Sequence, residues 1–245
     1  TFDKPGFVSG FDRKNSWKSL PICVKCAISI EAGKEYLNEK FLKQFDNFKF
    51  YVIPNFVFGE VNEEVMEEME SADKREYVDS ILCAEDYILD IIKEEEDVMN
   101  LIFMFIKPKQ KDFFDIIKYV EDVPPSWIKQ LSDALKEIRN LKIFRNEETL
   151  KKIFGEKKTG GLDSRITIDR LIRPFFPKSD YDKSFIDIIG DILGRKKIDK
   201  NFLINAFMRE IRNKHVNKEN WEEKTLCLKS FMLLKFLNKL KLIKN

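Results

Sequence analysis

Histidine is almost absent from this sequence, and catalytic motifs are missing with it. His215 is the single histidine, so no second imidazole is available to form a dyad or to share a metal ion. No serine or cysteine nucleophile lies in a recognisable elbow. Gly160-Gly161 is not followed by the Lys-Ser/Thr pair of a Walker loop. The sequence therefore predicts a protein without catalytic activity.

Long apolar runs and secretory features are also lacking. The most apolar stretch, residues 100–106, is far shorter than the ~20 residues that span a bilayer. No signal peptide is present, so we expect a cytoplasmic protein without membrane contact. Only 4 cysteines occur, which excludes a disulfide-stabilised secreted scaffold. Cys83 and Cys227 lie in apolar helical sequence, and we expect both to be buried.

Neither sign of charge dominates. Lys and Arg total 44 against 42 for Asp and Glu, which leaves a net charge of +2. Such a balance does not by itself indicate nucleic-acid binding, so phosphate contacts must come from local basic patches or from partners. With 43% hydrophobic residues and 22 Phe, the chain can form a large core. Scarce glutamine beside abundant lysine and glutamate suggests a thermophilic source.

Hydrophobic periodicity predicts a mixed first half. Pro54 is expected to end a strand that begins at Phe48, and an apolar run predicts a fully buried strand at 101–106. The remaining elements expected here are a helix at 27–38, a helix at 73–96 and a strand at 113–120.

After Pro124-Pro125 every segment has a helical pattern. Ser126 and Asp199 are expected to cap helices, and Gly194 to end one. The helices expected are 126–143, 146–155, 164–173, 181–193, 199–215 and 218–242. The fold class is α+β, predominantly α-helical: a partial zinc-knuckle region (1–46), a small α+β unit (47–123) and an α-helical bundle (124–245). The first residue is not Met and the last residues have helical character, so we interpret both ends as internal to a longer protein.

Cys23-Val24-Lys25-Cys26 is the sharpest local motif. Two thiolates at this spacing can bind one zinc ion from a single turn, but structural zinc requires four ligands. The motif is therefore half of a zinc site, and two free thiols without metal are the alternative. An acidic cluster could hold a divalent cation, although a solvated helix surface explains it as well; its members are Glu60, Glu63, Glu64, Glu67 and Glu68.

Basic residues near aromatic residues are the candidates for nucleic-acid binding. Each group also fits an ordinary charged surface. The candidates are Arg13, Lys14, Trp17 and Lys18 near the start, Arg165, Arg170 and Arg173 on one short helix, Arg195, Lys196 and Lys197 after Gly194, and Arg209 and Arg212 on a later helix.

Several motifs in the first half resemble one family. These are residues 2–10, residues 17–27 with the two cysteines, Gly33-Lys34-Glu35-Tyr36-Leu37, residues 50–54, residues 103–106 and residues 121–126. They are similar to the large subunit of type I-B CRISPR effector complexes, the Cas-eight-b or Csh-one family. In that family a second Cys-x-x-Cys lies upstream and completes a four-cysteine zinc ribbon, which explains the half site.

The resemblance implies a non-catalytic subunit of a CRISPR RNA-guided complex in antiviral defence. Its partners would be the complex backbone and small subunits, target DNA and the helicase-nuclease. Base pairing would read the sequence, while the protein supplies shape and electrostatic support. Two other functions stay open: a helical module that contacts only protein, and a metal-dependent nuclease that uses acidic residues.

Overall fold

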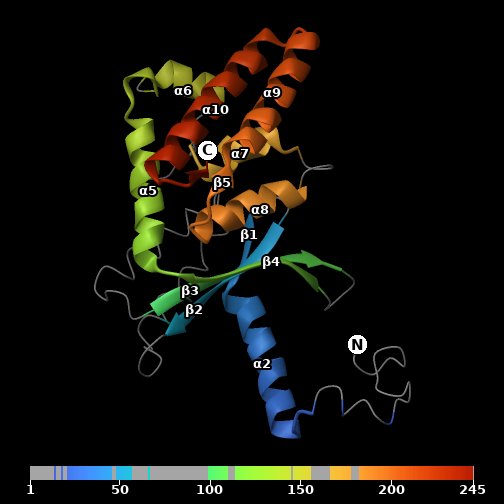
Figure 1. Cartoon of the computed structure of the whole chain (residues 1–245). Coiled ribbons are helices and arrows are strands. Elements are labelled where there is room, and N and C mark those ends of the chain that lie inside the picture. Colours follow the sequence, from blue (N-terminus) through green and yellow to red (C-terminus); the bar gives the residue numbers. More distant parts are fainter. Residues whose placement is uncertain are drawn as a thin grey trace. The chain divides into compact units, whose positions relative to one another are not determined.

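The computed structural model describes Lys14, Lys18, Met66 and residues 21–45, 48–56, 99–109, 114–144, 146–155, 166–177 and 182–244. The chain divides into two compact units, Thr1–Leu42 and Lys43–Asn245. The predicted helix 73–96, the acidic cluster and Cys83 lie outside the described residues. The predominantly helical α+β class is confirmed, because a single four-stranded sheet accompanies the helices in the described part (Figure 1).

The first unit contains helix α2 (Val24–Lys40), which begins three residues before the predicted start at Ala27. Cys23 is its N-cap, and Phe41 is its C-cap. No residue of α2 is buried, and several apolar side chains such as Val24, Ile28 and Ile30 are exposed. The helix is therefore held by its backbone and caps rather than by a buried face within this unit.

The sheet of the second unit has the order β1-β2-β3-β4, with β1 at Leu42–Phe45, β2 at Phe48–Phe56, β3 at Met99–Pro108 and β4 at Phe114–Val123. The β2–β3 and β3–β4 pairs are antiparallel. Phe50 lies opposite Phe105, and both are fully buried. Period-2 alternation places these side chains on one face, which forms the core.

Two details of the predicted sheet are wrong. Pro54 does not end β2 but lies within it, opposite Leu101. A strand tolerates proline at a position where the missing N–H is not needed for a hydrogen bond to the neighbouring strand. Strand β3 is not buried on both faces, because Ile102 and Met104 remain partly exposed. β1 was not predicted, since its sequence Leu-Lys-Gln-Phe carries little strand signal.

Helices follow the sheet in the order α5 (Pro125–Arg139), α6 (Glu147–Phe154), α7 (Ile168–Ile172), α8 (Asp182–Leu193), α9 (Lys200–Val216) and α10 (Asn220–Lys239), with 3₁₀ turns η5 (Lys142–Phe144) and η6 (Arg173–Phe175). α8 packs on β4, and α9 packs along α10 (Figure 1). Phe48 of β2 stacks on Phe185 of α8 at 5.9 Å between ring centroids, which joins the sheet to the helices.

The helix ends correct several expectations. α5 begins at Pro125, with Pro124 rather than Ser126 at the N-cap, because proline suits the first helical position. Ile166 and Thr167 are not helical, so the predicted helix 164–173 is shorter and ends in η6. Asp199 does cap α9, where its Oδ1 accepts a hydrogen bond from Phe202 N at 2.8 Å. The buried face of α9 includes Leu203, Ala206 and Phe207, whereas Phe202 is 44% exposed.

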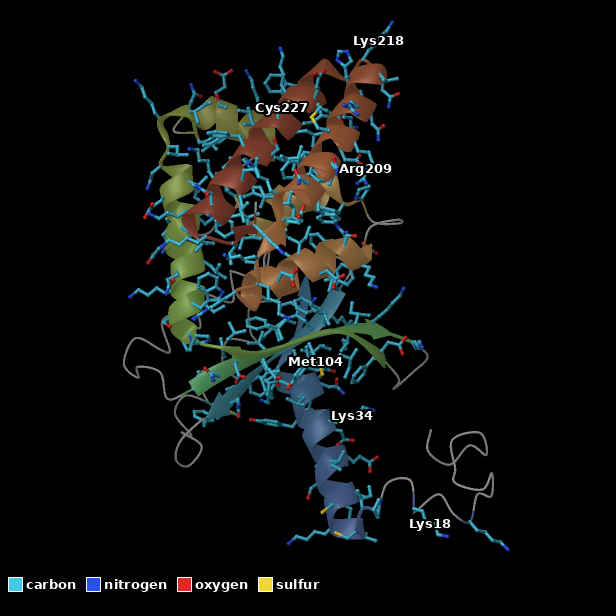
Figure 2. All side chains as sticks on the ribbon, viewed as in Figure 1. Lys18, Lys34, Met104, Arg209, Lys218 and Cys227 are labelled. Atoms are coloured by element: carbon cyan, nitrogen blue, oxygen red, sulfur yellow. The ribbon has the colours of Figure 1, made fainter. Side chains whose placement is uncertain are left out.

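Cys227 was expected in the core but is exposed on α10. Figure 2 shows its sulfur on the part of α10 that lies toward α9. Helix α10 buries Leu226, Met232, Leu233 and Phe236 instead. These residues lie on a different face of the helix from Cys227. Partial burial and the charge of Glu223 raise the pKa of the Cys227 thiol.

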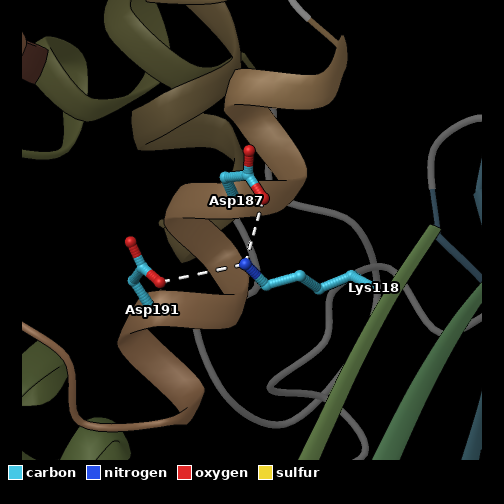
Figure 3. A network of polar contacts seen from close by, with 3 residues as sticks. All are labelled: Lys118, Asp187 and Asp191. Atoms are coloured by element: carbon cyan, nitrogen blue, oxygen red, sulfur yellow. Dashed lines mark hydrogen bonds and ion pairs between the residues drawn. The ribbon is translucent and has the colours of Figure 1, made fainter.

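Lys118 of β4 joins the sheet to α8 through two carboxylates. Its Nζ lies 3.0 Å from Asp187 and 3.9 Å from Asp191, one turn apart on α8 (Figure 3). Gly190 lies under the lysine stem: a Cβ there would come within 2.4 Å of Lys118 Cε and 3.0 Å of Cγ. The glycine in this helix interior therefore makes room for the side chain.

We expect Gly190→Ala to lower the free energy of unfolding by about 1 kcal/mol, although alanine normally stabilises a helix interior by a similar amount. The added Cβ displaces the Lys118 stem from its carboxylates. In a Lys118→Ala background the sign should reverse, and Gly190→Ala should stabilise. Urea unfolding of the four proteins of this cycle measures both effects. Equal effects of Gly190→Ala in the two backgrounds would contradict the assignment.

A buried carboxylate lies at the start of α7. Asp169 Oδ1 has no hydrogen-bond partner in the described part. Burial raises the pKa of Asp169 to about 6, against smaller opposing effects of the Thr167 hydroxyl and the Arg170 charge. The folded state therefore holds this proton more tightly than the unfolded chain, so stability from this group is lost as pH rises from about 4 through 6.

We expect Asp169→Asn to raise the free energy of unfolding at pH 7 by roughly 2 kcal/mol, because it removes the cost of a buried charge. At pH 4 the gain should largely vanish. Urea unfolding at both pH values tests this, with Asp133→Asn on the exposed side of α5 as the control that should change neither value. A gain that is the same at pH 4 and pH 7 would reject the explanation.

Candidate nucleic-acid interface

Two short strands bring distant basic segments together. β5 (Ile198–Asp199) pairs in parallel with β6 (Ile243–Lys244), so the predicted continuation of the last helix to residue 242 is wrong. Ile198 N donates to Leu242 O at 2.7 Å, and both side chains are buried. The flanking charged residues are left exposed. We call them the β5–β6 basic patch: Arg195, Lys196, Lys197, Lys200, Lys241 and Lys244.

The helix ends before each strand supply two of these cations. α8 ends at Leu193, directly before Gly194 as expected, and the left-handed residue after the helix is Arg195, with φ 55°. Lys241 takes the same place after α10, with φ 58°. Lys196 N donates to Asp191 O at 2.7 Å, and Leu242 N donates to Leu237 O at 2.9 Å. Both ends are thus Schellman motifs, and a cation is favourable beside the last carbonyls of a helix.

Positive charge is in excess across this patch. The two segments 195–200 and 241–244 contain one carboxylate, Asp199, which is used to cap α9. The carboxyl group of Asp191 lies close by. Burial raises the pKa of Asp191, while the positive charges of Lys118 and Lys196 lower it. Clustered lysines with little neutralising charge attract the phosphates of a nucleic-acid backbone.

An exposed aromatic ring lies next to the patch. Phe202 follows Lys200 in the first turn of α9 and is 44% exposed, while its ring stacks on Phe176 at 5.7 Å. Exposed aromatic rings beside lysines can stack on unpaired bases. Trp127 is buried instead: its Nε1 donates to Ile192 O at 3.0 Å, and Arg195 lies 4.9 Å above its ring.

Two arginines that were predicted to bind nucleic acid, Arg173 and Arg209, form hydrogen bonds within the helical bundle instead. Arg173 donates to Phe176 O and to Asp182 Oδ1, at 3.2 and 2.7 Å. Arg209 donates to Phe175 O at 3.0 Å and pairs with Glu210. These guanidinium groups satisfy the carbonyls at the end of η6, which explains their position without any nucleic acid.

The other predicted residues are scattered. Arg170 is half-buried on α7. Burial lowers the pKa of Lys229, and the charge of Arg170 lowers it further. Arg212 is exposed on α9. Lys14 and Lys18 belong to the first unit. Arg13, Trp17 and Arg165 lie outside the described residues.

Of the predicted candidates, the structure therefore places Arg195, Lys196 and Lys197 in one exposed patch. It adds Lys200, Phe202, Lys241 and Lys244, which sequence reasoning missed. Lys241 and Lys244 alternate with apolar residues at the end of a helical pattern, and only the parallel β5–β6 pairing shows that they adjoin residues 195–200.

Cys23 and Cys26 lie at the N-terminus of α2, where both are exposed. Cys26 N donates to Cys23 Sγ at 3.4 Å, and this backbone hydrogen bond is the main cause that lowers the pKa of the Cys23 thiol. A lowered pKa favours the thiolate that metals bind. Within the described residues, the two cysteines do not belong to any group of three or more side chains that could hold a metal ion.

Two family models match the chain in order. Residues 1–123 match the central domain of CRISPR-associated protein TM1802, and residues 168–245 match the C-terminal domain of the same protein. No curated protein and no solved structure matches the chain. Among the described helices, none combines the length and apolar character that crossing a membrane requires.

Proposed function

Because the chain belongs to the CRISPR-associated protein TM1802 family, we propose that it is a non-catalytic part of the large subunit of a type I-B CRISPR RNA-guided complex. In this proposal it acts in the cytoplasm in CRISPR–Cas defence and supports DNA recognition and strand binding. Its partners are the backbone and small subunits of the complex, target DNA and the helicase-nuclease.

The β5–β6 basic patch is the observation that supports DNA binding. Its lysines come from two segments that are far apart in the sequence, and the β5–β6 pairing brings these segments together with the lysines exposed. Phe202, two residues after Lys200, is exposed as well. The near-zero net charge of the chain agrees with a scaffold that contacts DNA locally rather than over its whole surface.

Fluorescence anisotropy with labelled single-stranded and duplex DNA tests the proposal. The affinity should fall steeply as salt rises, with a slope of about −3 to −5 in log K against log [salt], as expected for a few phosphate contacts. No binding at low salt would reject the proposal and would favour a module that contacts only protein.

Incubating labelled DNA with Mg²⁺ or Mn²⁺ tests the absence of catalysis, and the DNA should stay intact. Cleavage that disappears when an acidic residue is substituted would show a nuclease instead.

We further propose that Cys23 and Cys26 supply two thiolates to a structural zinc ion whose other ligands lie outside the described residues. The lowered pKa of Cys23 and the shared exposure of both thiols support this. Elemental analysis of the complete protein should show zinc, which Cys23→Ser with Cys26→Ser should remove. Equal zinc content in the unmodified protein and in the double variant would contradict this proposal.

A further inference from the structure

Strand β4 presents an apolar surface at the edge of the sheet. It is the last strand in the order β1-β2-β3-β4, so in the described part no strand pairs with its outer side. Ile116 is 57%, Ile117 38% and Tyr119 48% exposed. Large apolar side chains at this density on an edge strand invite pairing with another chain.

A β-bulge concentrates these side chains. Phe105 lies opposite Lys118, but the next residue of β3, Ile106, lies opposite Ile116, so Ile117 is an extra residue on β4. Adjacent residues of a regular strand point to opposite faces, and a bulge re-aims one of them. Two neighbouring isoleucines are therefore exposed together.

Tyr119 extends this surface across the sheet. It lies opposite Met104, which in turn lies opposite Tyr51. Figure 2 shows Met104 on the side of the sheet that points away from α8. Ile116, Ile117 and Tyr119 are thus the outer part of an apolar row, which we call the β4 docking surface.

One common protection of an edge strand, an outward-pointing lysine, is missing from β4. Natural edges often carry an outward lysine that repels incoming strands. Lys118 is the single lysine of β4, and it points inward to Asp187 and Asp191. The ion pair of Lys109 with Asp115 at 2.6 Å neutralises the charge at one end of the strand.

Negative charge remains at the other end. Glu121 and Asp122 are both exposed, and in the described part Asp122 receives a hydrogen bond from the neutral Asn100 side chain rather than from a cation. A segment that covers the apolar part of β4 would therefore gain from a basic residue near Glu121 and Asp122.

We propose that the β4 docking surface binds an extended segment of a partner protein, whose apolar side chains cover Ile116, Ile117 and Tyr119 and whose lysine or arginine reaches Glu121 and Asp122. The segment adds main-chain hydrogen bonds at the edge of β4, as in other cases of strand addition. This contact is independent of the β5–β6 basic patch and of DNA binding.

Site-specific photo-crosslinking in the complete protein, in its native assembly, tests this. Tyr119 is replaced by p-benzoyl-phenylalanine, the cells are irradiated, and the crosslinked peptide is identified by mass spectrometry. We expect one peptide of another protein, with alternating apolar residues and a basic residue. Adding Ile116→Lys should reduce its yield by about 10-fold or more, because a charge is placed in the apolar contact.

Trp221, which is 51% exposed on α10, is the matched control position and should not yield the same peptide. Crosslinks from residue 119 to nucleic acid, to this chain or to a second copy of it would overturn the proposal, as would no crosslink at all. If the Tyr119 substitution prevents folding, the same substitution at Ile117 provides the test with the same outcomes.

Discussion

Reversing three lysines of the β5–β6 basic patch is expected to weaken DNA binding by on the order of 100-fold at low salt. The variant is Lys197→Glu with Lys200→Glu and Lys244→Glu. All three side chains are exposed, so the fold should be retained. Lys200 is the first residue of α9, where an acidic residue is favourable for the helix. The loss therefore reports on phosphate contacts rather than on stability.

The same variant should reduce the salt dependence. Each phosphate contact that is lost should lower the magnitude of the slope of log K against log [salt] by about 1, so a shallower slope is as diagnostic as the lower affinity. Anisotropy titrations at several salt concentrations give both values.

Lys218→Glu with Lys224→Glu is the control for this experiment. Lys218 lies at the turn between α9 and α10 (Figure 2), and Lys224 lies near the start of α10. The 17 residues of α9 separate that turn from β5 by roughly 25 Å. This control should bind DNA nearly as well as the unmodified chain. If both variants lose affinity equally, the binding is a general charge effect and the patch has no special role.

Arg173→Ala is expected to lower the free energy of unfolding by about 3 to 4 kcal/mol, with no change in the salt dependence of DNA binding. The guanidinium lies 4.2 Å from the ring centroid of Phe185 and 5.6 Å from that of Phe48, and its side chain is 16% exposed. Alanine would leave Phe176 O without this donor and would remove a cation from two aromatic rings.

Arg173→Lys separates charge from shape. Lysine keeps the positive charge but lacks the planar group that reaches Asp182 and Phe176 O together, so we expect about half of the loss. Arg212→Ala, on the exposed side of α9, should change stability by less than about 0.5 kcal/mol. A stable Arg173→Ala protein with weakened DNA binding would contradict the structural role.

Local patterns predicted most of the described elements. The apolar runs of β3 and β4 and the spacing of buried residues in α8 are visible in the sequence, because burial on one face imposes a period. Asp199 was identified as a cap from its type and position alone. The helix boundaries were less accurate, as at Pro125 and Ile168, because several residues near each end can serve as caps.

Contacts between distant segments could not be predicted in this way. The β5–β6 pairing is two residues long on each side, too short to show strand character in either segment. Arg173 and Lys196 look alike as basic residues near helix ends, yet one is enclosed by Phe48 and Phe185 and the other is exposed. Only the tertiary structure distinguishes a basic residue that completes the core from a basic residue that is available to a ligand.

The parallel pairing of β5 with β6 also sets the order in which the basic patch arises during synthesis. Arg195, Lys196, Lys197 and Lys200 leave the ribosome well before Lys241 and Lys244, and the two groups meet only after α9 and α10 have both been made. A nascent chain that has reached α10 therefore carries four of the six cations of the patch, and it gains Lys241 and Lys244 only when the segment that forms β6 has been made.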